Sequence, residues 1–338
     1  MSQPSPTSQS AAHLKAPGGP HEESTPLGMA LVFGGWMLWS LDPIVIALIG
    51  PEVSRSLIVG VNLTLGGLVL SRHVGRLVRG LKGLSRTVRV RLVLQGVVFT
   101  GCASLFYVSA VRHMHPGLVS TVLRTQVAFA VIGAVALLGE RMNRTAVAGM
   151  AVIFLGNGMM VVRAARSAGL EDQSVLGWSL AMGAALLMTG GTLNGKVLLR
   201  AVAPTQLTGV RLLLGGLVMA GATLAMRGAA PFVELTSRQW FWLGVKGLGT
   251  TTIGFVVYYH GLKRVRVYVA SAIETAAPLL TIVAAWVLLD NPLRHRALVS
   301  VAVLLTGTAL VVVGSIRARR RGLPPRAKRI VNRTPGAR

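Results

Sequence analysis

The chain has 338 residues, 52% of them hydrophobic and only 13% charged, and its mean hydropathy is +0.61. Soluble domains carry charge on about a quarter of their residues, so this composition excludes an ordinary soluble domain and predicts an all-α polytopic membrane protein. The net charge of +25 does not indicate a nucleic-acid partner, because no stretch is both polar and long enough to form a basic domain. The one cysteine, Cys102, permits no internal disulfide, and we expect no metal and no cofactor.

The two ends of the chain are predicted to be tails. Residues 1–27 are rich in Ser and Pro and lack the apolar run of a signal peptide, so we expect a disordered cytoplasmic segment. Residues 316–338 carry nine Lys or Arg and several Pro. We expect this basic tail to lie in the cytoplasm against anionic lipid headgroups.

Ten segments between the tails are predicted to cross a bilayer, which takes about 20 mostly apolar residues. They cover residues 28–49, 54–71, 92–112, 116–138, 145–163, 176–199, 204–226, 239–262, 268–289 and 297–315. Five fall in each half, so we divide the chain into a first five-helix unit at 28–163, a linker at 164–175 and a second unit at 176–315.

The second unit repeats the first. Residues 94–162 recur 151 residues later, and residues 61–70 (VNLTLGGLVL) match 210–219 (VRLLLGGLVM) at seven of ten positions with an offset of 149. Because each copy has an odd number of helices, the second copy enters the membrane upside down relative to the first. Such inverted repeats are typical of many secondary transporters.

The basic residues predict the orientation. With the N-terminus inside, the cytoplasmic segments hold 24 Lys or Arg and the outer segments hold eight. Cytoplasmic loops carry the excess of basic residues, so both termini are predicted to be cytoplasmic, with the chain in the cell (inner) membrane. The same distribution accounts for most of the net charge.

The end of the fourth predicted helix carries a family signature. Residues 137–142 (LLGERM) resemble the Leu-Gly-Glu-Arg-Leu signature of EamA-like proteins in the drug/metabolite transporter superfamily. Residues 39–40 (WS) in the first helix, and Pro204 followed by Arg211 in the seventh, resemble the family as well. The resemblance implies a ten-helix inverted-repeat fold and transport of a broad range of substrates.

Two positions depart from the family pattern within the region of resemblance, about residues 28–315. Asn62 stands where the second copy has Arg211, and the second signature has become LDNP at 289–292. The first departure leaves open whether the arginine is needed in both halves. The second leaves open the role of an acidic residue there.

A carboxylate and a proline interrupt the first predicted helix. An ionisable side chain near the bilayer centre costs about 2.5 to 3.5 kcal/mol on insertion, so it is kept where it faces the bundle interior, water or a partner. Asp42 precedes Pro43, which removes a backbone donor and predicts a bend. The matching positions of the second copy, 190–192 (GGT), predict a second interruption, and paired interruptions indicate a midplane binding site. The alternative is a kink that packs against its neighbours with a neutral or hydrogen-bonded Asp42.

Arg124 and Glu274 are predicted to face each other near the pseudo-twofold axis, because superposing the repeats places Leu123 on Glu274. One interpretation is a structural ion pair. The other makes Glu274 a proton carrier whose pKa is tuned by burial and by Arg124. Both interpretations stay open.

Three other charged groups receive separate interpretations. Arg211 is either structural, near the cytoplasmic face, or in contact with substrate. Lys246 lies close to Trp240, and we predict that its long stem extends outward to the membrane interface. Glu140 is predicted to form a local ion pair with Arg141 that orders the next turn.

Four aromatic side chains are candidates for contact with substrate. Trp36 and Trp39 lie one turn apart on the first predicted helix, while Tyr107 and Tyr258 are equivalent positions of the two repeats. A cavity lined by such rings would suit flat or apolar substrates. The alternative for each ring is ordinary packing or a place in an interfacial belt.

These observations predict a secondary transporter that moves a small metabolite or drug-like molecule by alternating access, outward and coupled to protons through Asp42 or Glu274. The chain has no Walker-type ATP-binding loop, so the energy must come from a gradient. An exchanger of organic anions or phosphorylated metabolites is the alternative, with Arg124, Arg211 and Lys246 lining the cavity. A membrane enzyme is disfavoured because the chain has neither HExxH nor GxSxG, and a scaffold without flux is a further alternative. Substrate, direction, coupling ion and assembly, including a homodimer, are left open.

Overall fold

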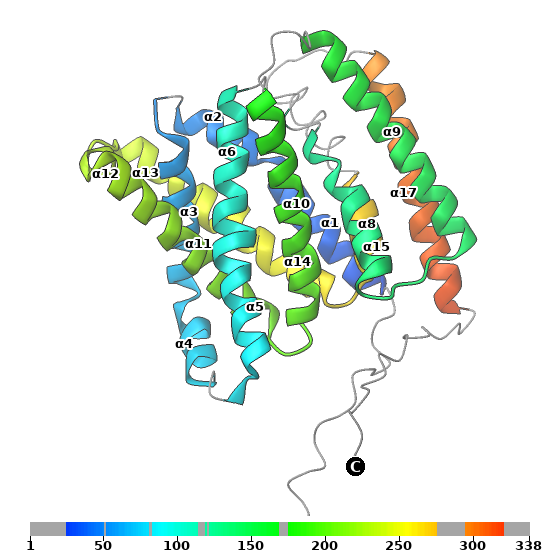
Figure 1. Cartoon of the computed structure of the whole chain (residues 1–338), viewed down its shortest axis with the longest axis horizontal. Helices are drawn as coiled ribbons and strands as arrows, with labels where there is room; N and C mark the ends of the chain where they lie inside the picture. Colours follow the sequence, from blue (N-terminus) through cyan, green and yellow to red (C-terminus); the bar gives the residue numbers. More distant parts are fainter. Residues whose placement is uncertain are drawn as a thin grey trace, which may run out of the picture.

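The computed structural model describes residues 25–50, 52–80, 83–113, 119, 122–168, 175–275 and 295–320. The regular structure of these residues is helical, and the helices form one bundle (Figure 1). Predicted parts outside these ranges include both tails almost entirely, most of the ninth predicted span and the LDNP sequence.

The first half of the chain forms α1 (Pro26–Ser40), α2 (Asp42–Ile49), α3 (Arg55–Val69), α4 (Ser71–Gly80), α5 (Arg86–Gly96), the π-helix η2 (Val97–Cys102), α6 (Ala103–His113), α8 (Gln126–Ala136) and α9 (Arg144–Ala168). The second half forms α10 (Val175–Leu198), α11 (Pro204–Arg227), α12 (Ala230–Val233), α13 (Ser237–Gly244), the π-helix η3 (Val245–Ile253), α14 (Gly254–Leu262), α15 (Val267–Glu274) and α17 (His295–Arg320).

The number of membrane spans is confirmed only in part. Three helical stretches of the described residues are long and apolar enough to cross a bilayer by length and composition: Arg86–Tyr107, Val175–Leu198 and Pro204–Arg227. A fourth is added if α3 and α4, which are bent by 70° at their junction, count as one broken span. Ten spans are not confirmed, because the first predicted span is divided into α1 and α2, and the fourth and ninth run into residues outside the described ranges.

The two repeats meet at a symmetric contact between α3 and α11. A Cβ added to Gly67 would lie 2.6 Å from the backbone nitrogen of Leu213, and a Cβ added to Gly216 would lie 2.4 Å from the backbone nitrogen of Thr64. Both pairs of equivalent positions, 64 with 213 and 67 with 216, differ by the offset of 149 found in the sequence. Glycine at both places lets the two helices approach to backbone contact.

The last helices of the two repeats, α9 and α17, lie side by side at one edge of the bundle (Figure 1). Their contact also depends on glycine. A Cβ on Gly149 would lie 2.7 Å from the carbonyl oxygen of Gly307, and a Cβ on Gly307 would lie 2.8 Å from the carbonyl oxygen of Gly149. This pair packs beside the bundle that holds the candidate site.

Candidate functional site

The first predicted helix breaks next to a carboxylate, as its sequence predicts. Helix α1 ends at Ser40 and α2 begins at Asp42. The residue between them, Leu41, donates its N–H to the carbonyl of Leu38 at 3.2 Å, and Pro43 occupies the first turn of α2, where a missing N–H is tolerated. The break places the Asp42 carboxylate inside the bundle instead of along a continuous helix face.

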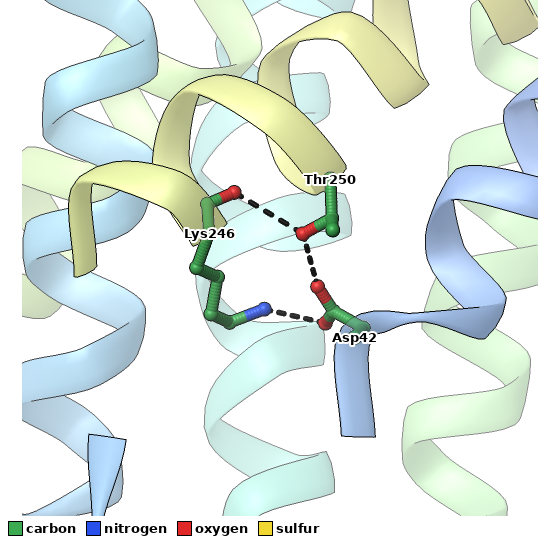
Figure 2. A network of polar contacts seen from close by, with 3 residues as sticks. All are labelled: Asp42, Lys246 and Thr250. Atoms are coloured by element: carbon green, nitrogen blue, oxygen red, sulfur yellow. Dashed lines mark hydrogen bonds and ion pairs between the residues drawn. The ribbon is translucent and has the colours of Figure 1, made fainter. Parts of the chain in front are cut away.

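Two side chains of the second repeat bind Asp42. The Lys246 ammonium donates to one carboxylate oxygen and the Thr250 hydroxyl donates to the other, as Figure 2 shows. The Thr250 hydroxyl also lies 3.2 Å from the carbonyl oxygen of Lys246, one turn earlier. The side chain of Lys246 is 7% exposed and that of Asp42 is 29% exposed, so the lysine is buried and the carboxylate is partly buried.

The prediction that Lys246 extends outward is wrong. Its ammonium turns inward to Asp42, on an element 204 residues away in the chain. An ammonium that leaves water needs an anionic partner, and the helix break supplies one at the depth of Lys246, so pairing replaces extension to the interface.

Lys246 and Thr250 both lie on a π-helix, and the corresponding segment of the first repeat is also a π-helix. Segment η3 covers Val245–Ile253, and η2 covers Val97–Cys102, which corresponds to 248–253 after the shift of 151. In both, a threonine hydroxyl donates five residues back: Thr252 to the carbonyl of Gly247 at 2.6 Å, and Thr100 to that of Gln95 at 2.7 Å. Such widened turns occur often at functional positions, because they re-aim side chains within a helix.

The contact of Asp42 has a repeat-related counterpart. Asp42 corresponds to Gly191, Lys246 to Gln95 and Thr250 to Phe99. A Cβ added to Gly191 would lie 3.2 Å from the Cβ of Phe99 and 3.5 Å from Nε2 of Gln95. The pseudo-twofold axis therefore relates two contacts between the repeats: the ion pair of Asp42 with Lys246, and the packing of Gly191 against Phe99 and Gln95.

The predicted interruption at 190–192 is wrong. Helix α10 is continuous from Val175 to Leu198. A Cβ on Gly190 would lie 2.5 Å from Cε1 of Phe99, so the glycines here make room for a ring. Without a proline the chain keeps its helical hydrogen bonds, so of these two matching positions only the one in the first repeat has a break.

A second polar network surrounds Gln95. Its Nε2 donates to the Tyr259 hydroxyl at 3.2 Å, and its Oε1 accepts from Nδ2 of Asn194 at 2.9 Å. Arg211 donates to the same Tyr259 hydroxyl, and its Nε donates to the Thr100 hydroxyl at 3.1 Å. The network joins α5, η2, α10, α11 and α14 through buried side chains.

Arg211 is buried, with 8% of its surface exposed, and its guanidinium lies 4.0 Å from the ring centre of Phe255 and 5.3 Å from that of Tyr259. Among the described residues, its hydrogen-bond partners are hydroxyl groups and no carboxylate forms an ion pair with it. The charge is therefore held by ring faces and hydroxyl dipoles, which is feasible for the weakly hydrated guanidinium.

Aromatic rings connect the helix break to Arg211. The ring centres of Trp36 and Trp39 are 4.8 Å apart, and Trp39 lies 5.1 Å from Tyr258 and 4.7 Å from Phe255. Phe255 stacks with Tyr259 at 6.2 Å. Three of the four predicted aromatic residues thus share one cluster. Nε1 of Trp36 is buried and has no hydrogen-bond partner among the described residues.

Glu274 and Arg124 do not form a direct contact. The Glu274 carboxylate, which is buried, accepts a hydrogen bond from Gln126, two residues beyond Arg124. Arg124 interacts with Glu274 electrostatically at longer range, and also with Tyr107, the fourth predicted aromatic residue. The predicted ion pair between these two charges stays a prediction for another conformation.

The chain matches the EamA-like transporter family twice, at residues 26–162 and 175–313. The chain belongs to the EamA-like transporter family. Members of this family are transporters rather than enzymes, and the protein is a multi-pass membrane protein of the drug/metabolite transporter type.

No curated protein matches this EamA-like transporter. A solved crystal structure, described only as that of a protein, has a TM-score of 0.69 and 21% sequence identity to it. The match covers 88% of this chain and 100% of the other. A likeness at that identity supports the fold and says nothing about substrate.

The EamA-like signature has a structural explanation in this transporter. Gly139 has φ +68°, a conformation that glycine adopts without strain, and turns the chain after α8. The carboxylate of Glu140 then accepts hydrogen bonds from the N–H groups of Val267 at 2.8 Å and Tyr268 at 3.2 Å, at the start of α15. The predicted ion pair of Glu140 with Arg141 is wrong, because the free amides of a helix start in the other repeat compete for the carboxylate.

Sequence reasoning missed Gln95, Asn194, Gln126 and Tyr259 as parts of the polar networks. A signal for one of them was present: the shift of 151 places Gln95 on Lys246, so both repeats carry a polar side chain at the same buried position. The others are single polar residues in apolar helices, and their partners lie on distant elements.

Proposed function

We propose that this protein is a secondary active transporter that exports a small metabolite or drug-like compound by alternating access, coupled to protons through Asp42. The contact of Asp42 with Lys246 carries the proposal. It joins the helix break of the first repeat to the π-helix of the second, so any motion that separates these elements must break it. The excess of basic residues on one side supports a chain in the cell (inner) membrane with both termini in the cytoplasm.

Protonation of Asp42 would favour that separation. Removing one partner of a buried ion pair leaves the other charge uncompensated, at about 3 to 5 kcal/mol when burial is complete and less for a carboxylate that is 29% exposed. A proton on Asp42 removes the attraction, and opening then costs less. Among the described residues, the charged or titratable groups that interact with Asp42 are Lys246 and, from α6, Tyr107. Proton binding and opening are thus linked through one carboxylate.

Exchange of organic anions or phosphorylated metabolites is the second candidate. Buried Arg211, whose described partners are uncharged, favours it, because a guanidinium without a carboxylate is free to pair with an anionic group. Arg211 would then be the residue that selects the substrate.

Purified protein in liposomes with a trapped pH dye tests both candidates. The panel contains amino acids, organic anions, phosphorylated sugars and cationic drugs, each presented to wild type, Asp42→Asn and Glu274→Gln. Glu52→Gln is the matched control, because Glu52 is also a carboxylate of the bundle but hydrogen-bonds to Gln239, at 2.7 Å.

We expect one compound class to move protons in wild type and in Glu52→Gln, and Asp42→Asn to abolish the proton movement while the protein stays folded. If Glu274→Gln abolishes proton movement and Asp42→Asn does not, the coupling group is Glu274. Exchange of labelled anions without any proton movement would refute proton coupling and favour the exchanger, for which Arg211→Gln should abolish exchange.

A further inference from the structure

Helix α4 has two chemically opposite faces and lies at the end of the bundle where α5 begins (Figure 1). Arg72, Arg76 and Arg79 recur at helical spacing on one face and are exposed. Val74 and Leu77 lie on the other face. Leu77 is 7% exposed, and Val74 Cγ2 lies 2.7 Å from where a Cβ on Gly209 of α11 would be. The apolar face therefore packs on the protein while the arginines point away from it.

The direction of α4 excludes a simple continuation of α3. The two helices are bent by 70° at Leu70, and α4 carries three arginines in ten residues. Arginine at the centre of a bilayer costs about 2.5 to 3.5 kcal/mol on insertion scales, so this helix belongs at the membrane surface and not across the hydrocarbon core. The bend turns α4 away from the α3 axis.

Among the residues that the structure describes, no carboxylate forms an ion pair with this surface. Arg86 and Arg89, at the start of α5, are exposed as well. The sequence contains no Asp or Glu between Glu52 and Glu140, and among the described residues none of the five arginines forms an ion pair. Glu140 is engaged with the start of α15. A cluster of arginines without counter-charge at a membrane surface attracts anionic headgroups.

We propose that Arg72, Arg76, Arg79, Arg86 and Arg89, together called the α4–α5 basic surface, bind the phosphate headgroups of anionic phospholipids in the adjoining leaflet. Val78, on the apolar side of α4, is 54% exposed and can contact the acyl region. Because Val74 packs against Gly209, two residues before Arg211, lipid bound here holds α4 on the helix that carries the buried arginine.

The test measures which lipids the full chain retains. Wild-type protein is placed in bilayer nanodiscs of phosphatidylcholine mixed with phosphatidylglycerol, extracted gently, and its bound lipids are counted by mass spectrometry. The test variant is Arg72→Gln/Arg76→Gln/Arg79→Gln, and the charge-keeping variant replaces the same three residues with Lys. The matched control is Arg55→Gln/Arg227→Gln/Arg238→Gln, three arginines that are also exposed.

We expect wild type, the Lys variant and the control to prefer phosphatidylglycerol. The Gln variant should lose its preference for phosphatidylglycerol by roughly fivefold for each arginine replaced. This factor corresponds to the ~1 kcal/mol by which an anionic membrane surface attracts one basic side chain. An unchanged preference in the Gln variant overturns the proposal. The preference for phosphatidylglycerol would then come from other basic residues, such as those of 316–338. Equal loss in the Lys variant also overturns it, because charge would then not be the cause.

Two further measurements complete the test. If the triple Gln variant does not fold, the three single substitutions are compared, and each should lose preference in part; no loss in any of them overturns the proposal. Inorganic phosphate is then added at constant ionic strength. Displacement of phosphatidylglycerol at millimolar phosphate would identify a free-phosphate site and contradict a lipid site.

Discussion

Lys246 and Gln95 occupy equivalent positions of the two repeats, yet they make different contacts. Lys246 pairs with the carboxylate of Asp42, whereas Gln95 lies 3.5 Å from where a Cβ on Gly191 would be, the position equivalent to Asp42. The duplication therefore supplied the same contact twice, and the two copies carry different chemistry. Of these two contacts, only the one with Asp42 can respond to a proton.

The pair of Asp42 and Lys246 should show energetic coupling. Asp42→Ala leaves a buried ammonium without its anion, and Lys246→Met leaves the carboxylate with Thr250 alone. We expect the double variant to be more stable than the sum of the two losses predicts, by about 1 to 3 kcal/mol. Thermal unfolding of the four proteins in one detergent measures this coupling. The Glu52 and Gln239 pair, tested in the same way, should give less than about 1 kcal/mol. Additive losses at Asp42 and Lys246 would contradict a coupled pair.

Gly190 should not tolerate a methyl group. A Cβ there would lie 2.5 Å from Phe99 Cε1, so Gly190→Ala should destabilise the protein by about 1 to 3 kcal/mol. Phe99→Leu in the same chain should restore part of the loss, because the smaller side chain gives way. Gly221→Ala is the control: it lies within α11 with open space around its Cβ, and alanine there should stabilise the helix by roughly 0.5 to 1 kcal/mol. Equal effects of the two substitutions would show that helix propensity, and not the contact with Phe99, determines the change in stability.

The break beside Asp42 was predictable from sequence and its partner was not. Proline acts on its own helix, so Pro43 located the break without knowledge of the fold. The partner, Lys246, is 204 residues away, and only the packed bundle brings the two together. The local environment of Lys246 next to Trp240 favoured the wrong interpretation.

The prediction of an interrupted helix at 190–192 was wrong because it, too, depends on a residue that is distant in the sequence. Gly190 and Gly191 are compatible with an interrupted helix or with close packing, and Phe99 on another element decides between them. The duplication itself is fully visible in the sequence, and its offset of 149 reappears in the symmetric contacts of α3 with α11. Spans were harder to count, because bends and π-turns divide apolar segments that hydropathy treats as continuous.

Glu140 should act as a cap for α15. Glu140→Ala removes the acceptor of two amide N–H groups and should cost about 1 to 2 kcal/mol, while Glu140→Gln should keep part of the effect. Thermal unfolding of the three proteins measures both losses. The neighbouring Arg141→Ala is the control, and its loss should be smaller: among the described residues its hydrogen bond is made by the backbone carbonyl, which accepts from Arg266 at 3.1 Å and is kept in the variant. Equal losses for Glu140→Ala and Arg141→Ala would contradict the capping role.

The same residue predicts a pH dependence. Burial raises the pKa of the Glu140 carboxyl above its ordinary 4.5, although the amides of Val267 and Tyr268 act in the opposite direction. The folded protein then keeps this proton to a higher pH than the unfolded chain, so the contribution of Glu140 to stability falls as pH rises through the folded pKa. The difference in unfolding temperature between wild type and Glu140→Gln should therefore decrease with rising pH. A difference that grows with pH would mean that the two amides, together with the charges of Lys196 and Arg266, outweigh burial.

Tyr259 should be essential to the placement of Arg211. Its hydroxyl accepts hydrogen bonds from both Arg211 and Gln95, so Tyr259→Phe leaves two buried donors without an acceptor and should cost about 2 to 3 kcal/mol. Arg211→Lys should also destabilise the protein, because an ammonium cannot reproduce the stacking at 4.0 Å over Phe255 together with two directed bonds. Thermal unfolding of each variant gives the losses. Tyr268→Phe is the control, since its hydroxyl contacts Arg266 only at 3.5 Å and should matter little. If Tyr259→Phe unfolds like wild type while Arg211→Lys does not, ring stacking alone holds the guanidinium, and the hydroxyl network has no part in it.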